Sequence, residues 1–201
     1  MVPTIKKNSI LYLQTGDGIS GGISNYIGFI VNSYIGKKYF CNIVVSIKNG
    51  EIKKNNSIYR NNKIIPFESE YNVLNLLSRV FVLKRIIEKN DYDIIHSHAL
   101  RSGIIAVLVK FLSKSKISIV HTNHGLRYTQ KNYFKKYFFM LYEFVLIKYA
   151  DKYVCIRDYD KKILLRDFFF DRKLLEKIKT IKLNLPFKIN ENIKFKFSNF
   201  A

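Results

Sequence analysis

Four histidines are the side chains of this sequence best suited to chemistry, and they fall in two pairs. His96 and His98 lie in DIIHSHALRSG, and His121 and His124 lie in HTNHGLRY, each pair at the end of a β-type run. Parallel strands end at one sheet edge, where open α/β sheets bind ligands. The strand that carries His96 is expected to end at that residue, so His98 should lie in the turn that follows. His96 and His121 are expected to pack within the sheet, and His98 and His124 to be the exposed, catalytic candidates.

A glycine-rich turn, TGDGISGG at 15–22, separates the first expected strand from the first expected helix. Its spacing matches G-x-G-x-x-G, which lets backbone N–H groups approach a diphosphate at a helix N-terminus, although glycines also simply permit a tight turn. An NAD site needs an acidic residue ending the second strand. None occurs between Asp17 and Glu51, which argues against NAD. An NADP-dependent reductase, with Lys48 beside the extra phosphate, stays open as an alternative.

Metal and nucleophile chemistry find little support. A metal site needs three or four converging ligands, and no carboxylate is near either histidine pair, so we expect no metal and no other cofactor. No G-x-S-x-G nucleophile elbow occurs. Cys41 and Cys155 are isolated, which predicts buried free thiols rather than a disulfide framework.

The chain carries 35 basic and 15 acidic residues, a formal charge of +20. Such a surface attracts phosphates in general, whether on nucleotide-sugars, lipids or nucleic acids. The cations are mostly Lys, and no dense run of them marks a nucleic-acid arm, so nucleic acid is not an expected partner. Joint enrichment in Lys, Asn, Ile, Phe and Tyr is also typical of an AT-rich coding sequence.

Short β-type runs alternate with longer helical patterns, which predicts an α/β, Rossmann-like, doubly wound and mostly parallel sheet. A polar stretch at 48–66 is expected to be a hairpin or an irregular excursion. Strands are expected at 9–14, 40–47, 93–96, 117–121, 153–156 and 178–183, and helices at about 22–34, 72–89, 102–112, 132–149 and 159–169.

Four segments in this order resemble the N-terminal domain of glycosyltransferase family 4. They are ILYLQTGDGISGGISNYI, DYDIIHSHALRSGIIAVL, ISIVHTNHGLRY and LIKYADKYVCIRDYDKKIL. The resemblance implies the acceptor-side half of a GT-B fold at 1–186, then a linker stub or disordered tail at 187–201. The family's C-terminal donor-binding domain has no counterpart here, so that domain is expected to be absent or separately encoded. TIKLNLP also lacks the glycine of the family's I-P-N-G-like turn.

The resemblance also implies roles for individual residues. Gly21 and Gly22 would approach the donor diphosphate. His98 matches the family's histidine near the transferring sugar, and His124 matches the histidine of the T-x-H-G turn lining the same pocket. The acceptor-side candidates are turn residues at the same edge: Asp17, Arg101, Arg127 and Tyr128.

The implied reaction is sugar transfer from a nucleotide-sugar to a cell-surface glycan or lipid-linked acceptor, with retention and without a metal. A catalytically silent, truncated binding module of the same fold is the alternative. The N-terminus shows no secretory signal, which predicts a cytoplasmic protein. The helix expected at 132–149 mixes Lys with a broad aromatic surface. That surface suggests peripheral contact with the inner face of the plasma membrane, although an ordinary sheet-covering helix would look similar.

Overall fold

The computed structural model describes residues 9–15, 22–33, 38–47, 62–68, 73–113, 116–130, 133–168 and 172–180. Gly21, Asp17 and the 187–201 segment lie outside these ranges, as does the end of the strand expected at 178–183. Within the described residues, no helix is both long and apolar enough to cross a membrane.

Seven described strands form one fully parallel sheet in the order β3-β2-β1-β4-β5-β6-β7. The order reverses between β1 and β4, which defines the switch point of a doubly wound sheet. The expected fold class is confirmed. The strands are β1 (Ser9–Gln14), β2 (Phe40–Ile47), β3 (Lys63–Glu68), β4 (Ile94–His98), β5 (Ser118–Asn123), β6 (Lys152–Cys155) and β7 (Ile178–Thr180).

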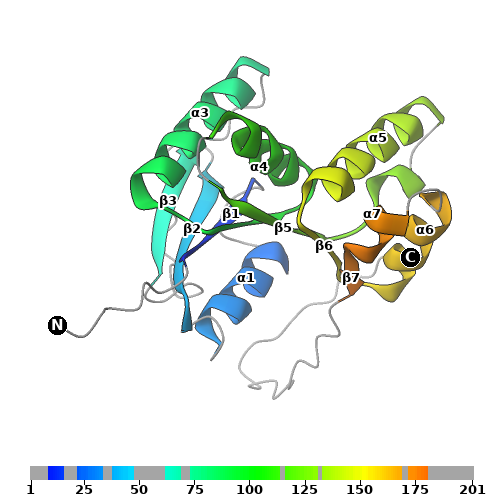
Figure 1. Ribbon diagram of the computed structural model, residues 1–201, viewed down its shortest axis with the longest axis horizontal. Helices are drawn as coiled ribbons and strands as arrows, with labels where there is room; N and C mark the ends of the chain where they lie inside the picture. Colours follow the sequence, from blue (N-terminus) through cyan, green and yellow to red (C-terminus); the bar gives the residue numbers. More distant parts are fainter. Residues whose placement is uncertain are drawn as a thin grey trace.

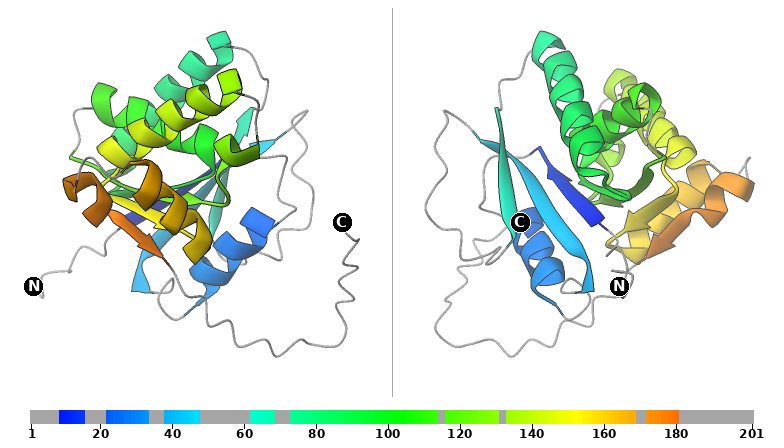
Figure 2. Two further views of the ribbon diagram at one scale, coloured as in Figure 1. Left: turned by 90° about the vertical axis from the view of Figure 1, so that its right-hand side faces the viewer. Right: turned by 60° about the vertical axis from the view of Figure 1, so that its left-hand side comes forward.

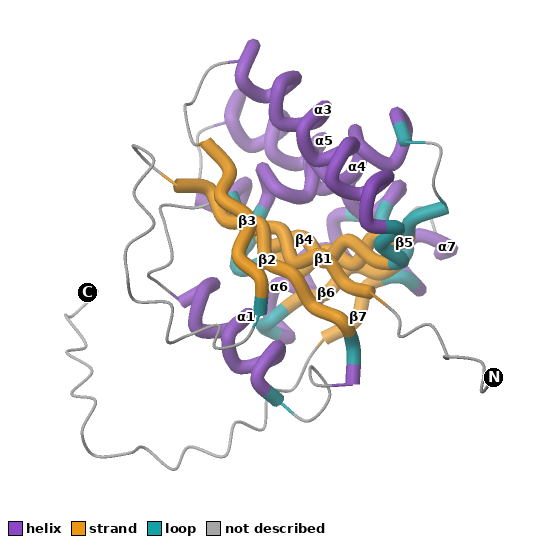
Figure 3. Tube along the Cα trace, turned by 90° about the vertical axis from the view of Figure 1, so that its left-hand side faces the viewer, coloured by secondary structure: helices purple, strands orange, loops and turns teal. Residues whose placement is uncertain are grey.

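Helices cover both faces of the sheet (Figures 1 and 2). α3, α4 and α5 lie over one face, and α1 lies over the other, as the view along the sheet in Figure 3 also shows. The helices are α1 (Gly22–Asn32), α3 (Val73–Asn90), α4 (Leu100–Leu112), α5 (Tyr133–Tyr149), α6 (Asp158–Asp167) and α7 (Arg172–Glu176), with a 3-10 turn η2 (Arg127–Gln130) before α5.

Two apolar cores hold these layers together. The larger one joins β-strand residues such as Leu13 and Ile119 to buried side chains of α3, α4, α5 and α6. The smaller one packs Ile27 and Val31 of α1 against Ile43 and neighbouring residues of β1 and β2. Cys41 and Cys155 are free and buried, as expected. Burial of these aliphatic side chains is the main contribution to stability.

Three expectations about elements were wrong. The stretch at 48–66 was expected to be a hairpin or an irregular excursion. Its end, together with the next two residues, forms the parallel edge strand β3 at 63–68. The polar composition of 48–66 concealed this strand. Its place at the sheet edge accommodates Pro66, which lacks the N–H of a ladder donor. β4 continues to His98 and β5 to Asn123, each two residues past the expected end. The short helix α7 was not expected.

Candidate functional site

The candidate site lies where β1, β4 and β5 end beside one another. His98 of β4 pairs in register with Gln14 of β1 on one side and with Thr122 of β5 on the other. The two strand-end turns that follow β4 and β5 are tied by a hydrogen bond from the Ala99 N–H to the Thr122 carbonyl, with N and O 3.2 Å apart. The histidine motifs therefore meet at one edge of the sheet, as the spacing predicted, and that place adjoins the switch point between β1 and β4.

His98 is buried, and the expectation that it is exposed was wrong. Its side chain is 0% exposed, because β4 continues to this residue and surrounding rings cover the imidazole. The Tyr12 ring is stacked 6.0 Å from it, and the Tyr26 ring meets it edge-on at 5.6 Å. His96 lies closer still, with ring centroids 4.3 Å apart. Aromatic rings thus set the orientation of His98.

His98 and His124 contact each other directly. Nδ1 of His98 and Nε2 of His124 lie 3.1 Å apart and share one hydrogen bond, although the residues are 26 positions apart in sequence. His124 is only partly buried, and the Tyr26 ring packs edge-on against it. Nε2 of His98 has no partner among the described residues. The hydrogen bond between the two rings links the buried imidazole of His98 to the partly exposed imidazole of His124.

The other two histidines are held within the sheet, as expected. His121 is fully buried, and its Nδ1 lies 3.0 Å from the Ser97 hydroxyl. His96 is partly buried, with Nε2 2.8 Å from the Thr122 hydroxyl. Gly103 of α4 sits against His121, because a Cβ on it would lie 2.8 Å from the His121 ring. That close approach requires glycine.

All four imidazoles are held neutral. Burial lowers the pKa of His96 and of His121 to about 3, with smaller contributions from neighbouring histidines. Burial alone lowers the pKa of His124 to about 4. Burial, followed by the other histidines, holds the pKa of His98 well below its ordinary value. The cluster can therefore donate and accept hydrogen bonds at neutral pH, but it does not supply positive charge.

The backbone is strained directly after His98. Ala99 has φ 67° and ψ 162°, a region that is essentially reserved for glycine. The Ser102 hydroxyl bonds back to the Ala99 carbonyl at 2.9 Å and also to the His98 carbonyl, which holds the start of α4 in place. Such strain costs about 1–3 kcal/mol and gathers at functional sites.

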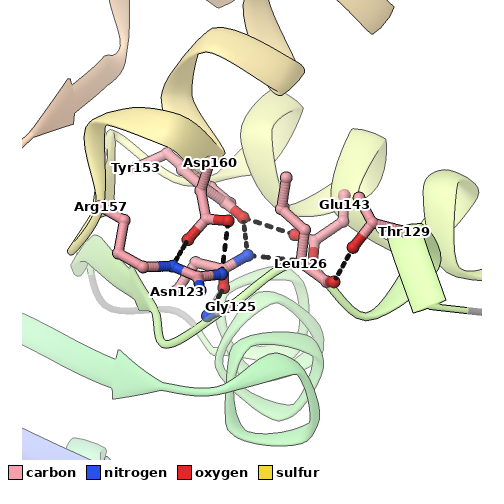
Figure 4. Close-up of polar contacts among 8 residues, drawn as sticks. All are labelled: Asn123, Gly125, Leu126, Thr129, Glu143, Tyr153, Arg157 and Asp160. Carbon is pink, nitrogen blue, oxygen red and sulfur yellow. Dashed lines mark hydrogen bonds and ion pairs between the residues drawn. The ribbon is translucent and has the colours of Figure 1, made fainter. Parts of the chain in front are cut away.

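The turn after β5 is held by a network of hydrogen bonds among polar side chains (Figure 4). The Gly125 N–H donates to Oδ1 of Asn123 at 2.5 Å, and Nδ2 of Asn123 donates to the buried carboxylate of Glu143 at 3.1 Å. Gly125 has φ 134°, which favours glycine. On the α6 side, Arg157 makes two hydrogen bonds to the buried Asp160, 2.7 and 2.8 Å long.

A pocket of about 420 Å³ opens at this edge of the sheet. It brings Gly22 at the start of α1 together with His124 and Arg127 of the β5 turn. A Cβ on Gly22 would meet nothing within 4 Å, so the space over this helix start is open. The remaining lining residues come from the ends of β4 and β5 and from α1, α4 and α5: Ile23, Ala99, Leu100, Asn123, Gly125 and Glu143.

The other expected site residues do not line this pocket among the described residues. Arg101 is exposed on the first turn of α4 but does not line this pocket. Tyr128, expected as a turn residue on the acceptor side, lies in η2 and is 1% exposed, and its hydroxyl donates to Asp167 at 3.0 Å. It is a core side chain because η2 turns inward there. Gly21 and Asp17, two further expected site residues, fall outside the described ranges.

Glu143 and Asn123 also belong to the site but were not predicted from the sequence. Glu143 is the single acid in the apolar helix YFKKYFFMLYEFVLIKY, a signal that it faces a polar partner inside the fold. Asn123 lies between the two histidines of HTNHG but was not itself considered. Both are buried and line the pocket.

The fold and its pocket define the class: a Rossmann-like α/β domain whose candidate site lies at the switch point of a parallel sheet. A family model described as Glycosyltransferase Family 4 matches residues 20–182, most of the chain. The chain belongs to that family. It is also 27% identical over 90 residues to an Escherichia coli UDP-Gal:alpha-D-GlcNAc-diphosphoundecaprenol alpha-1,3-galactosyltransferase, a match that covers 44% of this chain and 23% of the relative.

Solved structures show the same fold. The lipopolysaccharide outer core galactosyltransferase WaaB superposes with a TM-score of 0.64 at 16% identity, over 85% of this chain and 44% of that one. A glycosyltransferase from Rickettsia africae gives 0.62 at 22% identity, over 88% and 43%. A putative UDP-N-acetylglucosamine 2-epimerase from Listeria monocytogenes gives 0.61 at 15% identity, over 87% and 45%. This chain spans less than half the length of each of these proteins.

Proposed function

We propose that this domain is the acceptor side of a glycosyltransferase that moves a sugar from a nucleotide-sugar donor with retention and without a metal. The single observation that carries the proposal is the pocket shared by the α1 start at Gly22 and the His124 turn. The family assignment favours this activity over a reductase. The donor contacts beyond this domain would come from a second Rossmann-like domain, on the same chain or on a separate one.

The pocket chemistry suits a sugar phosphate. The first N–H groups of α1 carry partial positive charge, and the open space at Gly22 lets a diphosphate approach them. Arg127 adds a full positive charge at the pocket wall. The neutral His124 imidazole offers a hydrogen bond to a sugar hydroxyl, and His98 fixes its ring through the 3.1 Å contact.

A titration with UDP-sugars and UDP, followed by a transfer assay, tests the proposal. We expect nucleotide-sugar binding that Gly22→Ala weakens about tenfold, because a methyl group would occupy the diphosphate path. The same variant should unfold like wild type, because its Cβ meets no neighbour in the free protein. Equal donor affinity in both proteins would contradict the site. Binding without transfer, even with a second domain supplied, would favour the silent binding module.

The acceptor is proposed to be a glycan or a lipid-linked sugar at the cytoplasmic face of the membrane. The Escherichia coli relative is named for transfer to a diphosphoundecaprenol-linked sugar. In this chain, α5 exposes a continuous apolar surface: Phe134 is 92% exposed, and Tyr133, Tyr137, Phe138 and Leu141 are also exposed. Lys135 and Lys136 lie among them, so this surface combines aromatic side chains with positive charge, which suits an anionic membrane.

Vesicle co-sedimentation tests the membrane contact. We expect the chain to sediment with vesicles containing phosphatidylglycerol and to stay in solution with pure phosphatidylcholine. The double variant Phe134→Ser, Tyr137→Ser should lose most of this binding. Phe111→Ser, which changes an exposed aromatic residue of α4, is the matched control and should keep it. Equal sedimentation of the double variant and wild type would refute the α5 contact.

A further inference from the structure

Glu143 is a buried carboxyl group that is hydrogen-bonded to Asn123, at the start of the turn that carries His124. It belongs to α5, its side chain is 2% exposed, and it lines the pocket described above. A carboxylate is buried only at a high desolvation cost unless it is fully hydrogen-bonded, so its presence here requires an explanation.

The hydrogen bonds around Glu143 are complete only when the carboxylate is ionised. Oε2 accepts from the Tyr153 hydroxyl at 2.5 Å, and Oε1 accepts from Nδ2 of Asn123 at 3.1 Å. The second N–H of that amide donates to the Tyr153 oxygen at 2.5 Å. Every hydrogen of the Asn123 amide and of the Tyr153 hydroxyl then has an acceptor.

This arrangement fixes which way the Asn123 amide faces. The carboxylate only accepts, so it selects the NH₂ side of Asn123 and leaves Oδ1 for the Gly125 N–H at 2.5 Å. If the amide were flipped, the NH₂ group would face the Gly125 N–H, and two donors would oppose each other. Glu143 thus determines the conformation of the 123–125 turn, which includes His124.

We propose that Glu143 is a positioning residue of the sugar-transfer site, acting through Asn123 to hold the His124–Gly125 turn in its binding conformation. This inference rests on the proposed function for the identity of the ligand, but the hold on the turn is a property of the free chain. Glu143 acts through its ionised form, and its protonation weakens that hold.

The surroundings place this protonation near neutral pH. Burial, partly offset by the hydrogen bonds from Tyr153 and Asn123, raises the pKa of Glu143 to about 7. Asp160 of α6 raises the pKa further, and Arg127 of η2 lowers it. Asp160 is itself paired with Arg157. A proton on Oε1 would face the NH₂ group, and a proton on Oε2 would displace the Tyr153 hydrogen, so protonation costs the network a hydrogen bond.

The Gly125 amide of ¹⁵N-labelled chain reports on the turn without any assay of activity. We expect its resonance to titrate between pH 5.5 and 8.5 with a midpoint near 7. The histidines nearby titrate far lower, His124 at about 4 and His96 at about 3, so they do not mimic this midpoint. In Glu143→Gln the titration should vanish, and at fixed pH the Gly125 N–H should exchange roughly tenfold faster, the effect of losing one hydrogen bond.

Glu88→Gln makes the same change on the exposed surface of α3 and should keep the wild-type midpoint. Tyr153→Phe removes a hydrogen-bond donor to the carboxylate and should move the midpoint of the Gly125 titration to higher pH. This variant replaces Glu143→Gln in the test if Glu143→Gln does not fold. A Gly125 amide that does not titrate near pH 7 in wild type, or that titrates equally in Glu143→Gln, overturns the inference. So does an unchanged midpoint in Tyr153→Phe.

UDP-sugar affinity measured on the same samples separates the two proposals. We expect wild-type affinity to fall several-fold as the pH drops from 8 to 6, and the affinity of Glu143→Gln to be lower and independent of pH. A titrating Gly125 amide with no UDP-sugar binding at any pH would overturn the proposed function and support the hold on the turn. Binding that weakens in wild type and in Glu143→Gln alike would overturn the positioning role and leave the proposed function standing.

Discussion

The ends of β4 and β5 present the same motif, a histidine just before or within a turn. Different interactions fix the two histidines in place. At the end of β4, His98 is enclosed by aromatic rings and followed by the strained Ala99. At the end of β5, His124 stands on a turn tied by hydrogen bonds to a buried carboxylate. Ring packing is insensitive to pH as long as the imidazoles stay neutral, whereas the carboxylate network depends on an ionised group.

This difference shows that two neighbouring strand ends at one sheet edge can respond differently to pH. His98 is fully buried, whereas the partly buried His124 lines the pocket in which we propose that the ligand binds. Because the two ends bury opposite kinds of titratable group, their contributions to stability should change with pH in opposite directions. That opposition can be measured.

The largest effect is expected at the β4 end on acidification. The pKa of His96 is about 3 in the folded chain, below its unfolded value of 6.5, so its stabilising contribution is fully present above pH 6.5 and is lost as the pH falls toward 3. Between pH 6.5 and 3.5, wild type should lose roughly 4 kcal/mol more unfolding free energy than His96→Gln. Urea unfolding across this range measures the difference. Parallel curves for the two proteins would contradict the assignment.

The β5 end should show the opposite slope. The pKa of Glu143 is raised to about 7 from 4.5, so its contribution is fully present below pH 4.5 and is lost as the pH rises through 7. Relative to wild type, Glu143→Gln should therefore gain roughly 3 kcal/mol of unfolding free energy between pH 4.5 and 7.5. The same urea series measures it, with Glu88→Gln as the control. A difference that does not vary with pH would show that Glu143 does not titrate in this range.

Gly103 joins the two ends, because it lets α4 approach His121 of β5. Gly103→Ala would bring a methyl group within 2.8 Å of the His121 ring and of Leu146, in a region with little freedom to move. We expect a loss of about 1–3 kcal/mol of unfolding free energy. Thermal unfolding measures this loss. Gly22→Ala, where the new methyl meets nothing, is the matched control, and equal stability of the two variants would refute the close contact.

The smallest effect is expected at Ala99. Ala99→Gly relieves the positive φ and should raise the unfolding free energy by up to about 1 kcal/mol, because glycine adopts this conformation without strain. Ala106→Gly, in the interior of α4, should lower it by roughly the same amount. Chemical unfolding of both variants provides the comparison. A destabilised Ala99→Gly would mean that the backbone there is not strained.

Much of the fold could be predicted because the local patterns agree with the global one. The alternation of short β-branched runs with longer helical patterns indicated the parallel, doubly wound sheet, and the observed strand order has its switch point where the histidine motifs meet. The edge strand β3, which contains Pro66, was missed because the stretch at 48–66 is polar. Only its place at the sheet edge makes that proline acceptable.

The site was predicted in outline and corrected in detail. Spacing placed Gly22 and His124 at one edge, and the pocket brings them together. Spacing could not show that β4 continues to His98, since a strand end shifted by two residues moves that side chain from a turn into the interior. Nor could it reveal that Tyr128 points into the core.

The sequence by itself determined which residues alternate, where strands give way to helices, and therefore which turns gather at one edge of the sheet. Only the tertiary structure decided which of those turn residues are buried and which acid from α5 lies beneath them. The physical reason is that burial and hydrogen bonding depend on neighbours distant in the chain. Glu143 meets Asn123 and Tyr153 only after α5 has packed on the sheet, and only then do its desolvation and its partners set its role.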